Sequence, residues 1–145
     1  MKICMVISTL SSGGAERNAC MLANHFAKQN DVTLITLQKS KSCFYPLLSK
    51  IKIQNLDLIR NNFSIFTKVS NFIKRIYILR DNLIREKIEI LISFLETTNI
   101  TVLISSLFIK NIRIRIISDR NNPNFSENNF LINIFKVIFY RYADV

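Results

Sequence analysis

The sequence predicts an α/β domain in which a parallel, Rossmann-like sheet is covered by helices on both faces. Apolar strand-like runs alternate with helix-like segments along the chain. The first run, 3–8, has no polar face, as expected of a strand buried on both sides. Both glycines of the chain, Gly13 and Gly14, lie between this run and the first helical segment, where a tight strand-to-helix turn is needed.

Hydrophobic periodicity places the individual elements. Apolar residues at three- and four-residue steps predict helices over 15–27 and, with a stronger stripe, 64–87. Shorter helices are expected at 98–108 and 129–141, and a strand could begin at 142–145. Runs rich in β-branched residues, or alternating in polarity, predict the strands 3–8, 31–37, 51–56, 89–94 and 112–118. Arg80 is an anomaly, because it falls close to the apolar stripe of its helix.

The expected strand order locates a binding crevice. If the strands follow the commonest nucleotide-binding topology, 3-2-1-4-5, the sheet switches direction between the first and fourth strands. Ligands bind at such a switch point, outside the carboxyl ends of the strands. The loops 11–14 and 95–99 would face this crevice, and the loop 119–123 would lie beside them.

Size, charge and cysteine content limit the functional classes. A chain of 145 residues is one domain by the usual prior. Its net charge of +10 favours phosphates, nucleic acid or an anionic membrane surface as partners. Three cysteines without paired C-x-x-C spacing support neither a disulfide framework nor a zinc site, and they fit a reducing cytoplasm. Neither a signal peptide nor an uninterrupted membrane-spanning run is evident.

Several common cofactor and catalytic motifs are missing. The dinucleotide fingerprint G-x-G-x-x-G and the phosphate loop G-x-x-x-x-G-K-[ST] do not occur. Neither does a G-x-S-x-G nucleophile elbow or an H-E-x-x-H metal motif. The strand-to-helix joint at 11–17 nevertheless attracts anions, because glycines open the backbone and the first helical N–H groups point there.

Here the sequence shows a family resemblance. The stretch Ser11-Ser12-Gly13-Gly14-Ala15-Glu16-Arg17, followed by Leu22-Ala23-Asn24, resembles the amino-terminal domain of family 4 retaining glycosyltransferases of the GT-B fold. Further segments resemble the same family in the same order, namely 32–36, 44–47, 92–94 with 99–100, and 117–123. Aspartate stands at position 119 where the family usually has glutamate. The family's second domain, with its paired glutamates seven residues apart, has no counterpart in these residues.

The resemblance implies that residues 1–145 form the acceptor-binding half of a GT-B enzyme, with the nucleotide-sugar-binding domain absent. The complete enzyme would transfer a hexose-type sugar to a lipid-linked or polysaccharide acceptor. This half would bind neither metal nor cofactor, would be inactive alone, and has no assignable catalytic residue. The alternative is a non-catalytic subunit that completes its site with a partner chain carrying the donor-binding domain. A nucleic-acid-binding module explains the charge, but no recognised motif supports it.

Three candidate residues for acceptor or phosphate binding lie in the first joint. Gly13 and Gly14 would admit a ligand to the backbone, although a tight turn alone also explains them. Glu16 suits the first helical turn, where the helix dipole favours a carboxylate. Arg17 opposes the same dipole, which favours a ligand or an ion pair as its role.

Two further candidates lie at the later loops of the crevice. Arg120 suits fork-like hydrogen bonding of a phosphate or carboxylate. An ion pair with Asp119 or Glu127 explains it equally well. Asn99 is a candidate for acceptor binding, and support of the helix after Phe94 is the structural alternative.

The long helix carries a basic surface. Between residues 68 and 87 it has six basic and two acidic side chains. Basic residues beside an apolar stripe suit anionic lipid headgroups, although a charge run is usually a solvated face. Some members of the resembled family extend sugars on polyprenyl-diphosphate carriers, and the helix is similar to their basic helix. We therefore expect a peripheral position at the cytoplasmic face of the inner membrane, with contacts to membrane or lipid diphosphate from Lys68, Lys74, Arg75 and Arg85.

Overall fold

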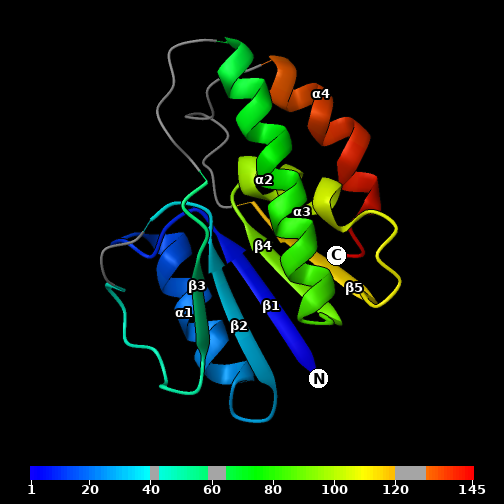
Figure 1. Ribbon diagram of the computed structural model, residues 1–145. Helices are drawn as coiled ribbons and strands as arrows, with labels where there is room; N and C mark the ends of the chain where they lie inside the picture. The colour runs from blue at the N-terminus through cyan, green and yellow to red at the C-terminus, as the bar shows by residue number, and fades with distance from the viewer. Residues whose placement is uncertain (40–42, 59–64, 120–129) are drawn as a thin grey trace.

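The computed structural model describes residues 1–39, 43–58, 65–119 and 130–145 (Figure 1). All five predicted strands and four predicted helices are present, with ends within two residues of the expected positions. The order is β1 Lys2–Ile7, α1 Gly14–Phe26, β2 Asp31–Thr36, β3 Lys52–Asn55, α2 Ile65–Arg85, β4 Ile90–Phe94, α3 Glu96–Ser106, β5 Ile114–Ser118, α4 Phe130–Phe139 and the short 3-10 helix η1 Tyr140–Tyr142.

The sheet has the predicted topology. Its five strands run parallel in the order β3-β2-β1-β4-β5. On the central strand β1, Ile3 is in register with Val32 of β2 on one side and with Ile90 of β4 on the other. The chain therefore changes direction between β1 and β4, and the switch point lies where we expected it.

Helices cover both faces of the sheet, which confirms the predicted fold class. On one face the small residues Ala15, Ala19 and Ala23 let α1 approach Met5 of β1 closely. On the other face Leu79 and Leu83 of α2 join the cluster around Val6 and Leu91. The helix α4 packs against α3 in this second layer, and the amino-terminal half of α2 reaches past the strands beside α4 (Figure 1).

Arg80 supports the end of a neighbouring helix, which explains its place near the apolar stripe. Its Nη1 donates to the main-chain oxygens of Ser105, at 3.1 Å, and Leu107, at 2.5 Å. Arg115 of β5 donates to the carbonyl of Ser106 at 3.1 Å. Because α3 has no basic residue in its own last turn, two arginines from other elements satisfy its terminal carbonyls.

The last residues pair with the edge strand β5. The N–H of Asp144 donates to the carbonyl of Arg115 at 2.8 Å, and the N–H of Ile117 donates to the carbonyl of Val145 at 2.9 Å. No strand forms at 142–145: η1 ends at Tyr142, and the residues after it pair with β5 only through these backbone hydrogen bonds.

None of the helices in the ranges given above is long and apolar enough to cross a membrane.

Candidate functional site

The candidate site lies at the carboxyl edge of the sheet, at the switch point between β1 and β4. Ser8, directly after β1, is hydrogen-bonded through its hydroxyl to that of Thr98 in α3, with the oxygens 3.0 Å apart. Leu95 alone joins β4 to α3, and its φ of 75° is rare for a residue with a side chain. Residues in such strained conformations are often found near functional sites. At Leu95 the sharp turn places the start of α3 beside the loop after β1.

The two glycines have different surroundings. Gly13 is the N-cap of α1 in extended conformation, with φ −165°, and Gly14 is the first helical residue. A Cβ at Gly13 would collide with the carboxylate of Glu16, whereas a Cβ at Gly14 would meet nothing within 4 Å. Gly13 therefore makes room for a side chain of the protein itself, and Gly14 leaves the start of the helix open.

Glu16 folds back over the loop and places its own negative charge at the start of α1. Its Oε1 accepts a hydrogen bond of 3.1 Å from the hydroxyl of Thr9, which is also 2.9 Å from that of Ser11. The carboxylate complements the positive end of the helix dipole. A ligand at this loop would meet hydroxyls and a carboxylate, an arrangement that suits the hydroxyl groups of a sugar better than a bare phosphate.

Arg17 is exposed on the first turn of α1. Its backbone N–H donates to the carbonyl of Gly13 at 2.9 Å, as helix geometry requires. Its guanidinium has no ion pair or side-chain hydrogen bond with any residue that the structure describes. Both roles expected for Arg17, ligand binding and an ion pair, therefore stay predictions.

Asn99 is the centre of a polar cluster on the other side of the switch point, and the Asn99 cluster comprises Ser93, Glu96, Asn99, Asp119, Lys136 and Tyr140. The amide is fully buried. Its Oδ1 accepts from the Ser93 hydroxyl at 2.7 Å, and its Nδ2 donates to Asp119 at 2.9 Å. Both ends of the side chain are used within the fold, as in the structural alternative given for Asn99.

Lys136 and Tyr140 complete the Asn99 cluster from α4 and η1. The ammonium of Lys136 lies 2.8 Å from Glu96 and 3.1 Å from Asp119. Burial lowers the pKa of Lys136, but the hydrogen bonds to these two carboxylates outweigh burial and raise it above its usual range. Burial and the hydrogen bond to Asp119 raise the pKa of Tyr140 to about 12, although the Asn99 amide acts in the opposite direction.

Sequence reasoning did not find most of the Asn99 cluster. The available signal was Lys136, a single charge within the apolar run 130–139, because such a charge needs a partner when its helix packs against the protein. Arg120, predicted to bind a phosphate or carboxylate, lies outside the described residues. Asp119, one of its two suggested partners, is already bound by Asn99, Lys136 and Tyr140.

The basic residues of α2 do not form one group. Lys68 and Arg75, two helical turns apart, line an apolar groove of about 400 Å³ between α2, α3 and α4. Lys74 lines a different hollow with Asp57, Leu58 and Asn71. Arg85 lies at the far end of α2, where its Nε is 3.1 Å from Asp81. Lys68 and Arg75 therefore share a concave surface, whereas Lys74 and Arg85 do not line it.

The groove with Lys68 and Arg75, here called the α2–α4 groove, combines apolar walls with charge. Phe72 and Phe135 line it, together with Thr97 and Thr101 at the start of α3. The Nε of Arg75 is buried with no hydrogen-bond partner among the described residues, and burial lowers the pKa of this guanidinium. A buried donor without an acceptor is costly, so Arg75 is suited to receive an anion.

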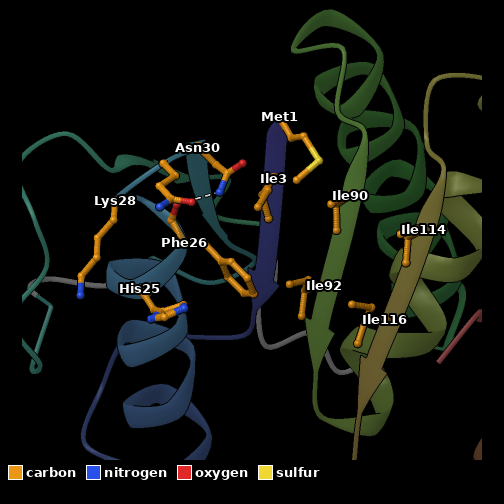
Figure 2. A pocket seen from close by; sticks show the side chains of 11 residues that line it. Met1, Ile3, His25, Phe26, Lys28, Asn30, Ile90, Ile92, Ile114 and Ile116 are labelled. Atoms are coloured by element: carbon orange, nitrogen blue, oxygen red, sulfur yellow. Dashed lines mark hydrogen bonds between the residues drawn. The ribbon is translucent and has the colours of Figure 1, made fainter.

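A second apolar hollow lies far from the switch point. Figure 2 shows the end of α1, with His25 and Phe26, facing isoleucines of β4 and β5. The hollow between them has a volume of about 400 Å³. Met1 and Asn30 place this hollow at the opposite, amino-terminal edge of the sheet. Within the ranges that the structure describes, no three histidine, cysteine or acidic residues gather in a metal-binding arrangement.

Comparison with known proteins adds one relative. No family model matches the chain. The chain is 36% identical over 110 residues to the GalNAc-alpha-(1->4)-GalNAc-alpha-(1->3)-diNAcBac-PP-undecaprenol alpha-1,4-N-acetyl-D-galactosaminyltransferase of Campylobacter jejuni. The match covers 76% of this chain and 30% of the relative. Over three quarters of its length the chain is therefore a homologue of a glycosyltransferase, of whose length it spans less than a third.

Proposed function

We propose that the chain is the acceptor-binding part of a retaining glycosyltransferase of family 4 and GT-B fold that acts on a lipid-diphosphate-linked acceptor. The observation that carries this proposal is the α2–α4 groove, where the buried Nε of Arg75 has no hydrogen-bond partner among the described residues and the guanidinium lies over the ring of Phe72. A diphosphate attached to a hydrocarbon chain has both features that this groove offers. The name of the relative, which includes a PP-undecaprenol acceptor, supports the same ligand class.

The two parts of the site would divide the acceptor between them. The loop after β1, with Gly14 open and Arg17 exposed, would hold the sugar end beside the carboxylate of Glu16. Lys68 and Arg75 would hold the diphosphate, and Phe72 and Phe135 would contact the first isoprenoid units. Asn99 would act indirectly, by fixing Asp119 at the edge of the site. Arg120 follows Asp119 directly and remains a proposed contact to the acceptor.

The basic side chains of α2 would hold this part of the enzyme at an anionic membrane surface on the cytoplasmic side. Each basic residue near such a surface contributes roughly 1 kcal/mol of attraction. Lys68 and Lys74 are exposed and available. Arg85 would contribute least, because it already pairs with Asp81. If this is correct, charge reversal at Lys68, Lys74 and Arg75 abolishes co-sedimentation with anionic vesicles, whereas unchanged co-sedimentation removes the membrane contact from the proposal.

Donor binding and catalysis would require a second domain, as the resemblance to two-domain GT-B enzymes implies. The nucleotide-sugar would be bound by a further domain of the complete enzyme or by a partner chain. In the second case this chain is a non-catalytic subunit in a polysaccharide pathway. Either way residues 1–145 would bind the acceptor without turnover.

The direct test is calorimetric titration of the chain with a matched set of ligands. A short-chain polyprenyl-diphosphate-linked N-acetylhexosamine should bind, whereas the corresponding polyprenol without phosphate should not. A uridine-diphosphate sugar, which carries a diphosphate but no hydrocarbon, should bind weakly. Equal binding of every anion, including a single-stranded RNA, would show only general attraction to the +10 charge and would contradict the proposal.

A further inference from the structure

The helix α4 exposes its apolar side chains and turns its only charged side chain inward. Lys136 points into the protein, where it pairs with Glu96 and Asp119. Val137 is 81% exposed, and the large apolar residues Ile134, Phe135 and Ile138 are exposed as well. A surface helix of a globular protein normally has the opposite arrangement. The outward face of α4 is therefore suited to an apolar partner.

The amino-terminal half of α2 continues this surface. Val69, Ile73 and Tyr77 are large, exposed side chains on that helix. The two helices line the α2–α4 groove together and lie side by side beyond the strands (Figure 1). Lys68 and Lys74 are also exposed there. Apolar side chains are thus flanked by positive charge on one side of the molecule.

We propose that α4 penetrates the boundary between lipid headgroups and acyl chains, with Val137 and Ile138 as its most deeply inserted side chains. This inference rests on the proposed membrane location and adds the element that enters the bilayer. An anionic bilayer fits this surface better than a second copy of the chain, because Lys68 and Lys74 match anionic headgroups. Two copies with a charge of +10 each would repel one another.

Penetration by α4 would set the depth of the α2–α4 groove. Its lining residues come from α4 and α2 alike, with Phe135 on one wall and Arg75 on the other. With α4 among the upper acyl chains, Arg75 and Lys68 lie at headgroup level, where the diphosphate of a lipid carrier is found. The carrier could then enter the groove sideways without leaving the bilayer.

The chain contains no tryptophan, so one introduced residue reports on its own surroundings. The test compares Val137→Trp with Met21→Trp on α1, where Met21 is also exposed but lies in the opposite layer. Vesicles contain equal parts of phosphatidylglycerol and phosphatidylcholine, with or without bromine on the acyl chains. The indole at 137 should shift to the blue and be strongly quenched by brominated lipid. The indole at 21 should show neither change.

A second pair of variants measures the strength of insertion. The double variant Val137→Ser/Ile138→Ser should weaken partitioning into these vesicles at least about tenfold. The reason is that the two serines lack the apolar carbons that valine and isoleucine would bury in the bilayer. Met21→Ser should leave partitioning unchanged. Circular dichroism checks that each variant keeps its helices.

The other outcomes overturn the inference in distinguishable ways. Co-sedimentation without quenching at position 137 would mean that charge alone binds the membrane, so α4 insertion fails while the proposed membrane contact of α2 stands. A blue shift without lipid that grows with protein concentration would identify a second copy as the occupant. Failure of the unaltered chain to co-sediment with anionic vesicles would remove both the insertion and the membrane contact.

Discussion

The two sides of the switch point differ in how their polar groups are used. On the side of the loop after β1, Arg17 has no side-chain partner among the described residues, and the space above Gly14 is open. On the other side, Asn99 and Asp119 bind partners from β4, α4 and η1. Both sides carry residues that the sequence marks as candidates. The open side is suited to a ligand, and the closed side holds the elements in place.

This difference teaches that position at the crevice does not by itself make a residue a ligand contact. Asn99 is fully buried and has partners at both ends of its amide. A side chain in that state contributes mainly to stability, because its loss leaves several buried groups unpaired. Substitutions should therefore separate the two sides, with effects on stability at one and on binding at the other.

The largest effect on stability is expected at Asn99. Asn99→Ala leaves the buried Ser93 hydroxyl without its acceptor and removes one of the hydrogen bonds to Asp119, whose Oδ1 keeps the bond from Tyr140. The variant should lower the free energy of unfolding by about 3 kcal/mol. Chemical denaturation measures the change. Asn133→Ala, at an exposed position of α4, is the matched control and should stay within about 0.5 kcal/mol. If Asn99→Ala lowered the free energy of unfolding by less than about 1 kcal/mol, a stabilising role for this side of the switch point would be contradicted.

The closed side should also respond to alkaline pH through Tyr140. Its folded-state pKa of about 12 exceeds the ordinary value of 10.0, so the unfolded chain loses its phenol proton first. This contribution to stability is complete below pH 10 and is lost as the pH rises towards 12. Titration of tyrosinate absorbance should show a component with a midpoint near pH 12. That component should disappear in Tyr140→Phe and persist in Tyr142→Phe; its presence in both variants would refute the assignment.

The two glycines offer a finer test of the open side. Gly13→Ala displaces the Glu16 carboxylate from the start of α1 and should cost about 1 kcal/mol. Gly14→Ala meets no atom and should be neutral or stabilising by about 0.5 kcal/mol. In a double-mutant cycle Gly13→Ala should be coupled to Glu16→Ala. Additive effects would show that Glu16 does not depend on the space at Gly13.

The smallest effect on stability is expected at Arg17. Because its charge opposes the helix dipole and has no described partner, Arg17→Ala should stabilise the fold by about 0.3 kcal/mol. The same variant should bind the polyprenyl-diphosphate-linked sugar less tightly, whereas Arg113→Ala, an exposed arginine on the far side of the sheet, should not. Clear destabilisation by Arg17→Ala would reveal a structural role and would contradict the proposal that Arg17 contacts the ligand.

Local sequence patterns predict most of the fold because it depends on short-range periodicity. The buried strands and the stripe of α2 require particular spacings within one element, and the glycine joint requires two adjacent residues. Contacts between distant elements leave no such pattern. Lys136 forms an ion pair with Glu96, which is forty residues away in the sequence, and Arg80 donates to a carbonyl at the end of α3. The separation of Arg85 from Arg75 follows from helix length, but the groove at Arg75 depends on where α4 packs.

The most direct measurement is a comparison of two arginines on the same helix as ligand contacts. Arg75→Ala and Arg85→Ala each remove one positive charge. Both variants and the unaltered chain are titrated with the polyprenyl-diphosphate-linked N-acetylhexosamine. Removal of Arg75 from the α2–α4 groove should weaken binding at least about tenfold. Removal of Arg85, which pairs with Asp81 at the far end of α2, should leave binding unchanged. Equal losses in both variants would mean that the ligand responds to net charge alone and would contradict an acceptor site in the groove.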